Sequence, residues 1–173
     1  NINEVSIKED TGWAEKHLNS LRHNYAKSPF FKPLLPEIEA WYDTVSAMNN
    51  LCDVNRFFVE KIMALLAIDT KLSWSTGYQI EGEREDKLLN LCKAAGATHY
   101  LSGPAAKDYI PDGFFENADI TLEYANYVGY PAYPQIHGEF DHYVTILDLL
   151  FSMGVEAAVD FMRYSAADFI EAV

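Results

Sequence analysis

One short stretch carries residue types that are suited to holding a ligand: "THYLSGPAAKDY", residues 98–109. An apolar segment leads into Ser102 and Gly103, and Lys107 and Tyr109 follow in a chain with a strong excess of acids. A glycine at a strand end lets backbone N–H groups approach phosphate or carboxylate oxygens, and a lysine adds a positive point charge. The alternative is a turn in which the glycine and the next proline merely end the strand. The pattern alone leaves both interpretations open.

A second candidate is His23, in the stretch "HNYAKSPFF". Helical spacing places it near the end of a predicted helix and almost opposite the apolar face. A histidine titrates near neutral pH and can act as an acid, a base or a hydrogen-bond donor to a ligand. Alternatively, it is a solvated side chain favoured by the helix dipole at that end.

Asp148 lies in "VTILDLLFSMG", residues 144–154, where apolar residues surround almost the whole helix. The polar positions form one stripe of Thr145, Asp148 and Ser152. A helix that is apolar on nearly all sides is buried, so this carboxylate requires partners. It either completes a capping box with Thr145 or serves as a ligand-orienting group or base.

The loop "QIHGEFDHY", residues 135–143, contains four potential metal ligands: His137, Glu139, Asp141 and His142. In an extended chain the first three share one face, which is compatible with a metal cluster. A polar, solvated loop has the same composition. We expect no metal here, and we expect no cofactor.

Helical and strand patterns alternate along the chain and must position these residues. Helices are predicted over 11–25, through "EIEAWYDTVSAM", "VNRFFVEKIMALLA" and "EREDKLLNLCKAAG", and over about 145–153 and 155–171. Strands are predicted for "NEVSIK", "KLSWST", "ATHYLS" and "DITLEY". The predicted core faces are Trp13, Ala14, Leu18, Leu21 and Tyr25 in the first helix and Val54, Phe57, Phe58, Ile62 and Leu65 in the third.

Strand, helix and strand in close succession are typical of a parallel sheet. We therefore expect one α/β domain over residues 1–173, helix-rich, with a parallel or mixed sheet flanked by helices. The predicted strands are few for the amount of helix, so we expect the domain to be incomplete, with a segment missing upstream.

Composition excludes several classes of partner. There are 26 acids against 13 bases, a net charge of -13, and no basic cluster of the kind that nucleic acids or anionic membranes require. No apolar run approaches the roughly 20 residues of a membrane span, and the opening "NINEVSIKED" does not resemble a signal peptide. Cys52 and Cys92 lie in apolar helical patterns without CxxC spacing, which indicates buried, reduced thiols and a cytoplasmic protein.

Four stretches occur in the order found in one known family: "KHLNSLRHNYAKSPFF", "GEREDKLLNLCKAAGATHYLSGPAAKDY", "YPQIHGEF" and "TILDLLFSMG". Over nearly its whole length the sequence resembles the WbqC-like family. The most specific pieces are "YLSG", "YPQ" and "ILDLLF" followed by glycine. This family usually opens with a strand and loop that carry a His-Gln-Pro and aromatic signature, which is absent here. That difference agrees with the expectation of a missing upstream segment.

The resemblance implies a bacterial cytoplasmic α/β protein of surface-polysaccharide biosynthesis, notably of the O-antigen of lipopolysaccharide. It further implies a transferase that moves an acyl or aminoacyl group to a nucleotide-linked amino sugar. His23 or Asp148 would accept a proton, and the Ser102–Gly103 loop and Lys107 would hold phosphate or carboxylate oxygens. The matching positions that would bind or orient the substrate are Asn24, Tyr25, Tyr109 and Gln135.

The partner would then be a small molecule, a nucleotide sugar or an acyl donor, and a homo-oligomer is compatible with the sequence. A second hypothesis is a non-catalytic binding or scaffolding module of a polysaccharide assembly complex. Its contact surface would be the loop at residues 127–134, because tyrosine favours interfaces. A metal-dependent hydrolase built on "HGEFDH" is the third hypothesis.

Overall fold

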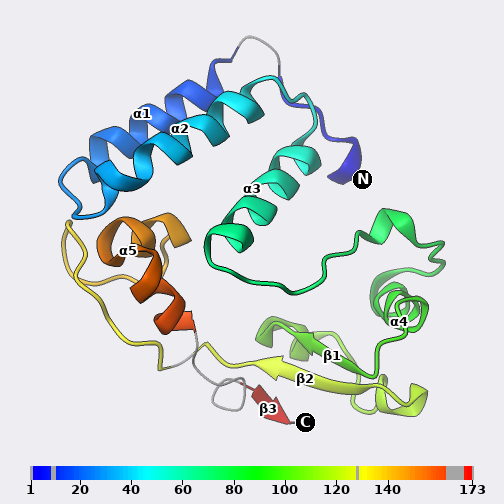
Figure 1. Cartoon of the computed structure of the whole chain (residues 1–173). Helices are drawn as coiled ribbons and strands as arrows, with labels where there is room; N and C mark the ends of the chain where they lie inside the picture. Colours follow the sequence, from blue (N-terminus) through cyan, green and yellow to red (C-terminus); the bar gives the residue numbers. More distant parts are fainter. Residues whose placement is uncertain (1, 9–10, 128, 163–169, 173) are drawn as a thin grey trace. The chain divides into compact units, whose positions relative to one another are not determined.

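The computed structural model describes residues 2–8, 11–127, 129–162 and 170–172, which divide into two compact units. Unit 1 comprises Asn1–Asp69 and Pro131–Arg163, and unit 2 comprises Thr70–Tyr130 and Tyr164–Val173. Long helices make up most of unit 1, and unit 2 contains a small sheet and a helix (Figure 1). This confirms the predicted α/β class, helix-rich and with a mixed sheet.

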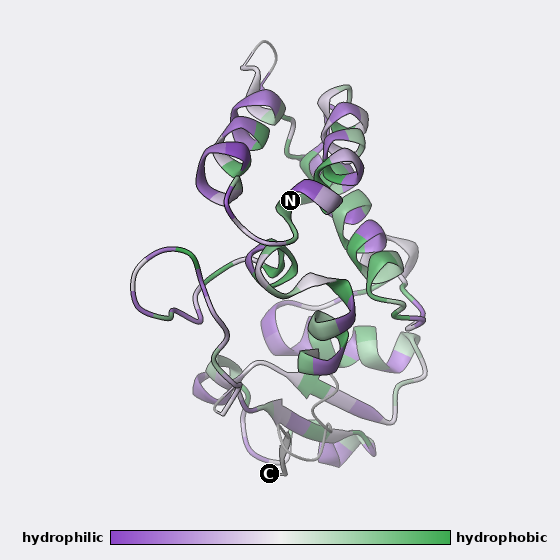
Figure 2. Ribbon diagram, turned by 60° about the vertical axis from the view of Figure 1, so that its left-hand side comes forward, coloured by the Kyte–Doolittle hydropathy of each residue, from purple (hydrophilic) through white to green (hydrophobic). Residues whose placement is uncertain are grey.

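Unit 1 is built on amphipathic helices. They are α1 (Trp13–Tyr25), α2 (Phe31–Ser46), α3 (Leu51–Leu65) and α5 (Ile146–Met162), preceded by the short 3₁₀ helix η1 (Ile2–Glu4). Figure 2 shows hydrophilic and hydrophobic residues alternating along the helical ribbons. Their apolar faces meet in a core that includes Trp41, Val45 and Phe151, and every predicted core residue of the first and third helices packs in or against it.

Helix α2 begins earlier than predicted and takes in two prolines. Pro33 stands in the first turn, where a backbone N–H has no partner within the helix, so its missing donor costs little there. Pro36 lies further inside. The predicted strand "NEVSIK" was wrong: Ile2–Glu4 is a 3₁₀ helix, and Ser6 forms a single antiparallel bridge with Asn50.

Unit 2 contains the sheet. Its elements are η2 (Ser75–Gly77), α4 (Arg84–Ala94), β1 (His99–Ser102), η3 (Pro104–Asp108), η4 (Glu116–Ala118), β2 (Thr121–Ala125) and β3 (Ile170–Ala172). The strand order is β1-β2-β3; β1 and β2 are parallel, and β2 and β3 are antiparallel. Helix α4 ends as predicted before Gly96, whose φ of 68° lies in the left-handed region. The core includes Ile110, Phe115, Ile120 and Leu122.

Two predictions of regular structure were wrong in this unit. Residues 71–74 of "KLSWST" have no regular structure, and Ser75–Gly77 is a 3₁₀ helix. Leu72 is exposed, so the alternation of Leu72 and Trp74 does not mark a strand with one buried face. The last predicted helix does not reach residue 171, because Ile170–Ala172 pairs with β2 as a strand. Residues 163–169 lie outside the described part of the chain.

Helix α5 is broken at Gly154, as the prediction of two closing helices required. Gly154 has a φ of 79° and a ψ of 169°, a backbone conformation that residues other than glycine rarely adopt. A Cβ atom there would lie 2.8 Å from the ring of Phe30, whose own N–H donates to the Phe151 carbonyl at 3.0 Å. The kink thus lets the segment before α2 pack closely against α5.

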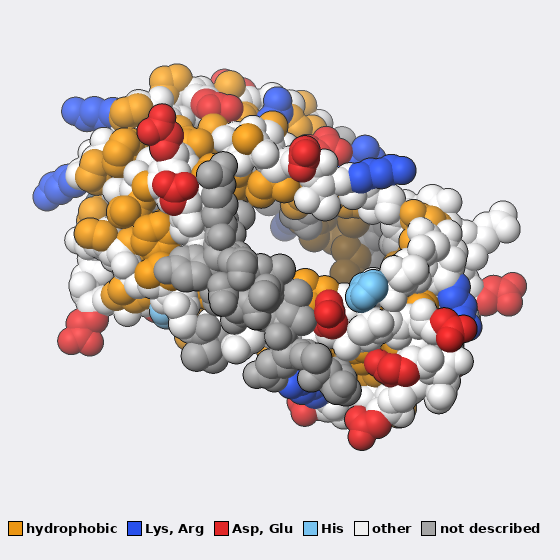
Figure 3. All heavy atoms as spheres, turned by 60° about the horizontal axis from the view of Figure 1, so that its bottom comes forward, with side chains coloured by type: hydrophobic (Ala, Val, Ile, Leu, Met, Phe, Trp, Pro, Cys, Tyr) orange, Lys and Arg blue, Asp and Glu red, His pale blue; other side chains and the backbone are white. Residues whose placement is uncertain are grey.

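The described surface agrees with the acidic composition. On the face shown in Figure 3, acidic side chains are spread over the surface and the lysines and arginines stand apart from one another. Of the helices in the described ranges, none combines the length and apolar character that crossing a membrane requires. Cys52 and Cys92 are both free; Cys92 is buried as predicted, whereas Cys52 is half-buried.

Candidate functional site: a buried carboxylate with two tyrosines

Asp148 lies in the first turn of α5 and is the centre of a hydrogen-bond cluster within unit 1. Its side chain is 6% exposed. The Tyr25 hydroxyl donates to Oδ2 at 2.9 Å, and the Tyr133 hydroxyl donates to Oδ1 at 2.7 Å. Gln135 Nε2 donates to Oδ1 at 3.2 Å. Three neutral donors therefore satisfy a buried carboxylate, as its burial requires.

The capping-box interpretation of Asp148 is half right. The Thr145 hydroxyl accepts the N–H of Leu147 at 3.1 Å, so Thr145 does cap the start of α5. In a capping box the acid reaches back to the backbone N–H of the capping residue. Asp148 instead directs both oxygens towards Tyr25, Tyr133 and Gln135.

Gln135 holds the loop before α5 in place. Its Oε1 accepts the backbone N–H of Asp141 at 2.9 Å, and its Nε2 donates to the carbonyl of the same residue at 2.8 Å. Nε2 also lies 3.4 Å from the Tyr133 hydroxyl. The amide therefore ties the 135–141 loop to the carboxylate, and it positions Tyr133 as it does so.

Both tyrosines of the cluster are poor acids. Burial raises the pKa of Tyr25 to about 12, and the hydrogen bond to Asp148 adds to the shift. Burial also raises the pKa of Tyr133 to about 12, again with a contribution from Asp148. At neutral pH both are hydroxyls that donate to the carboxylate. Each oxygen keeps lone pairs that can accept a proton or a hydrogen bond from a ligand.

Two further hydroxyls are buried beside this cluster. Ser152 follows Asp148 by one helical turn, and the backbone N–H of Ser28 donates to the Tyr25 carbonyl at 2.9 Å. Both side chains are buried, and in the described structure neither Oγ has a hydrogen-bond partner. Unit 1 thus buries two hydroxyl groups besides the Asp148 carboxylate.

His23 and Asn24 lie in the last turn of α1. His23 is exposed in the last turn of α1, and no hydrogen bond or ion pair within the described ranges joins it to Asp148. The Asn24 side chain donates to the Ser20 carbonyl at 2.8 Å. The Asn24 carbonyl lies 2.9 Å from His137 Nε2, and this contact ties α1 to the loop.

That loop gives no sign of a metal centre. Across the described segments, no three His, Cys, Asp or Glu side chains come together in a way that could hold a metal ion. His137 contacts Asn24, and an Asp141 oxygen accepts the N–H of Tyr143 at 2.8 Å. These polar side chains shape the loop.

The remaining predicted residues lie in unit 2. Ser102 is the last residue of β1, is buried, and pairs in register with Tyr124 of β2. The Lys107 ammonium lies 5.1 Å from the centre of the Tyr124 ring. Tyr109 is exposed. Ser102 and Lys107 are therefore both neighbours of Tyr124.

Gly103 has no conformational need to be glycine. Its φ is -72°, which any residue adopts, and a Cβ atom added there would meet nothing within 4 Å. It precedes the 3₁₀ helix Pro104–Asp108 and ends the strand, as the turn interpretation proposed. The open space above it is still compatible with a ligand approaching the backbone.

Sequence reasoning missed Tyr133. It stands two positions before Gln135 in "YPAYPQ", and side chains two apart in an extended segment point to the same side. That spacing is the signal that would have found it. The cluster can orient a ligand through two hydroxyl oxygens and an amide, with a buried carboxylate behind them.

Comparisons with known proteins identify the family. A protein of Mycobacterium tuberculosis (strain ATCC 25618 / H37Rv), named uncharacterized protein Rv1507c, is 36% identical over 162 residues, which cover 92% of this chain and 68% of that protein. No solved structure matches the chain. The profile of the WbqC-like protein family matches residues 1–160, so it includes Tyr25, Tyr133, Gln135 and Asp148. The chain belongs to the WbqC-like protein family.

Proposed function

We propose that this protein takes part in the biosynthesis of a bacterial surface polysaccharide, as a transferase that acylates the amino group of a nucleotide-linked amino sugar. Family membership supports the biosynthetic role. The observation that carries the chemistry is the cluster in which Tyr25, Gln135 and Asp148, from three separate sequence motifs, are joined by hydrogen bonds. The O-antigen is the surface polysaccharide we favour.

The buried carboxylate is suited to act through a tyrosine. Both oxygens of Asp148 already accept hydrogen bonds and its side chain is 6% exposed, so a substrate amine would meet the half-buried Tyr25 more readily. As the amine attacks the acyl carbon, its proton passes to the Tyr25 oxygen and the tyrosine proton passes to Asp148. The bond from the acyl carbon to the leaving group then breaks, and the same relay returns the proton to the leaving group.

The other predicted residues take supporting roles in this proposal. Within unit 1, Tyr133 and Gln135 hold the carboxylate and orient the sugar, with Asn24 as a further contact. Within unit 2, Ser102, Gly103 and Lys107 are the residues that we propose for binding phosphate or carboxylate oxygens, with Tyr109 as a further contact. His23 is an alternative proton acceptor, since it is exposed and lies two residues before Tyr25 in the same motif.

The test is a thermal-stabilisation titration of the purified chain with UDP- and dTDP-linked amino sugars. The proposal expects at least one of them to raise the melting temperature, and the double substitution Ser102→Ala with Lys107→Ala to weaken that effect. Lys93→Ala, at the end of α4, is the matched control for loss of one positive charge. No stabilisation by any nucleotide sugar would contradict the proposal.

A non-catalytic binding module is the second candidate, and exposed tyrosines favour it. Tyr127, at the start of the tyrosine- and proline-rich loop, is 64% exposed. This candidate expects Tyr127→Ala to abolish binding to a protein of the polysaccharide assembly complex, with no effect of nucleotide sugars. The transferase proposal expects the opposite result: nucleotide sugars have an effect, and Tyr127→Ala does not abolish binding.

We place the protein in the cytoplasm, where nucleotide sugars are made and thiols such as Cys52 and Cys92 stay reduced. The single-domain organisation over residues 1–173 and a homo-oligomeric state remain predictions.

A further inference from the structure

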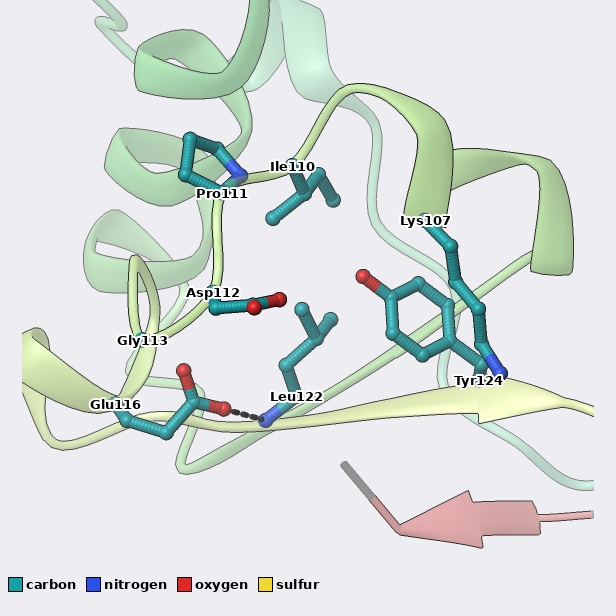
Figure 4. A pocket seen from close by; sticks show the side chains of 8 residues that line it. All are labelled: Lys107, Ile110, Pro111, Asp112, Gly113, Glu116, Leu122 and Tyr124. Atoms are coloured by element: carbon teal, nitrogen blue, oxygen red, sulfur yellow. Dashed lines mark hydrogen bonds between the residues drawn. The ribbon is translucent and has the colours of Figure 1, made fainter.

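A small cavity lies wholly within unit 2, between β2 and the loop that follows η3. Its volume is about 200 Å³. Its walls include Ile110, Pro111, Asp112, Glu116, Leu122 and Tyr124 (Figure 4). Pockets for drug-sized ligands occupy about 300–1,000 Å³, so this cavity suits a smaller molecule.

Tyr124 is the residue that makes this cavity a candidate ligand-binding site. Its side chain is 4% exposed, and Figure 4 shows its hydroxyl directed into the cavity. No hydrogen bond reaches that hydroxyl from any residue of the described chain. The hydroxyl faces the cavity, so it can exchange a hydrogen bond with a molecule bound there.

Two carboxylates supply the charge of the cavity. Glu116 Oε1 accepts the backbone N–H of Leu122 at 3.2 Å, which fixes this side chain and leaves its second oxygen for a ligand. The Asp112 carboxylate points into the cavity on the side of the Tyr124 hydroxyl (Figure 4). In the described ranges, neither carboxylate forms an ion pair.

Lys107 also lines the cavity and brings a positive charge to it. Its ammonium lies 5.1 Å from the centre of the Tyr124 ring. In Figure 4 it stands at the end of the ring opposite the hydroxyl, away from Asp112. Two carboxylates, Asp112 and Glu116, against the single ammonium of Lys107 leave the cavity lining with a net negative charge, and Ile110 and Leu122 supply an apolar wall.

These groups match one kind of ligand. An ammonium group has three N–H donors and no acceptor, and the cavity offers three acceptors in Asp112, Glu116 and the Tyr124 hydroxyl. The apolar wall suits the carbon atoms that carry the ammonium. We propose that the cavity beside Tyr124 binds the primary ammonium group of a small organic amine. The proposal is independent of the acyl transfer, because the amines that test it carry no nucleotide.

The experiment is an NMR titration of the 173-residue chain at neutral pH with ethanolamine and n-butylamine. Ethylene glycol and n-butanol are the neutral counterparts. We expect both amines, and neither alcohol, to shift the backbone N–H resonances of Leu122 and Tyr124 with dissociation constants in the millimolar range. Asp112→Asn and Tyr124→Phe should each weaken binding about three- to tenfold, since each removes one hydrogen bond or charge.

The matched control is Asp119→Asn, which makes the same charge change in unit 2 outside the cavity. Asp119 has a φ of 58°, which asparagine also tolerates, so the fold should be unaffected. Amine binding should persist in this variant within a factor of two. Equal binding of amines and alcohols would overturn the proposal. So would full amine affinity in both cavity variants, or an equal loss in Asp119→Asn, which would indicate attraction to the net negative charge.

Discussion

The replacement Tyr25→Phe tests whether the Asp148 cluster is a stabilising feature of unit 1. The substitution removes one hydroxyl and keeps the ring, whose centre lies 5.1 Å from that of Phe151. Oδ2 of Asp148 then loses its donor, since the other two described donors bind Oδ1. A hydrogen bond to a buried charged group contributes about 1.5–3 kcal/mol, so we expect destabilisation of about 2–3 kcal/mol.

Tyr133→Phe should be milder than Tyr25→Phe. When the Tyr133 hydroxyl is lost, Oδ1 of Asp148 still accepts a hydrogen bond from Gln135, so this carboxylate oxygen keeps one donor. We expect a loss of about 1–2 kcal/mol. In an Asp148→Asn background the carboxylate is gone, and the cost of Tyr25→Phe should fall by at least about 1 kcal/mol, a coupling typical of groups in contact.

The assay is urea unfolding at neutral pH, with the midpoint compared at constant slope. The control is Tyr143→Phe: Tyr143 is 97% exposed, so its change should stay within about 0.5 kcal/mol. The reasoning would be refuted if Tyr25→Phe were no more costly than this control. An unchanged cost in the Asp148→Asn background would refute the coupling.

Two further predictions concern the kink and the tyrosines. Gly154→Ala should lower the free energy of unfolding by about 3 kcal/mol or more, because the backbone conformation is rare and the added Cβ would lie 2.8 Å from the Phe30 ring. The control in the same urea experiment is Gly12→Ala, which should cost only about 1–2 kcal/mol because Gly12 has a φ of 56° but open space around it. Similar losses in the two variants would contradict the steric argument. The pKa values of about 12 for Tyr25 and Tyr133 lie above the ordinary 10.0, so their stabilising contribution is complete below pH 10 and is lost as pH rises to 12. Absorbance titration should show a late phase near pH 12 that shrinks in Tyr25→Phe, and an unchanged late phase would exclude Tyr25 from it.

The sequence predicted best those features that depend on residues within a single helix or strand. The core faces of the first and third helices follow from 3.6-residue spacing, and Gly96 ends α4 where its left-handed φ is required. The predicted strand at "KLSWST" was wrong because alternation of apolar and polar residues does not by itself provide a neighbouring strand to pair with. Leu72 is exposed, and the hydrogen bonds of a strand depend on a partner that local sequence does not name.

The candidate site was predictable in part. The apolar surroundings of Asp148 showed that its carboxylate needs partners, but not which residues supply them. Tyr25 lies 123 positions away, a separation that periodicity cannot bridge, and the family motifs supplied it. Tyr124 was missed because a tyrosine in a strand pattern suggests a core position, and its ring is indeed buried. The direction of its hydroxyl, into the cavity, is visible in the structure and not in the sequence pattern.

The central claim is that Tyr25 and Asp148 act on the amine of a nucleotide-linked amino sugar, and a calorimetric titration tests it most directly. The ligands are the UDP- or dTDP-amino sugar that stabilises the chain and its N-acetylated form. The account predicts that the chain binds the free amine up to about tenfold more tightly, since the amine can donate to the Tyr25 oxygen, and that Tyr25→Phe removes this preference. Equal affinities for the two forms, or a preference that survives Tyr25→Phe, would contradict it.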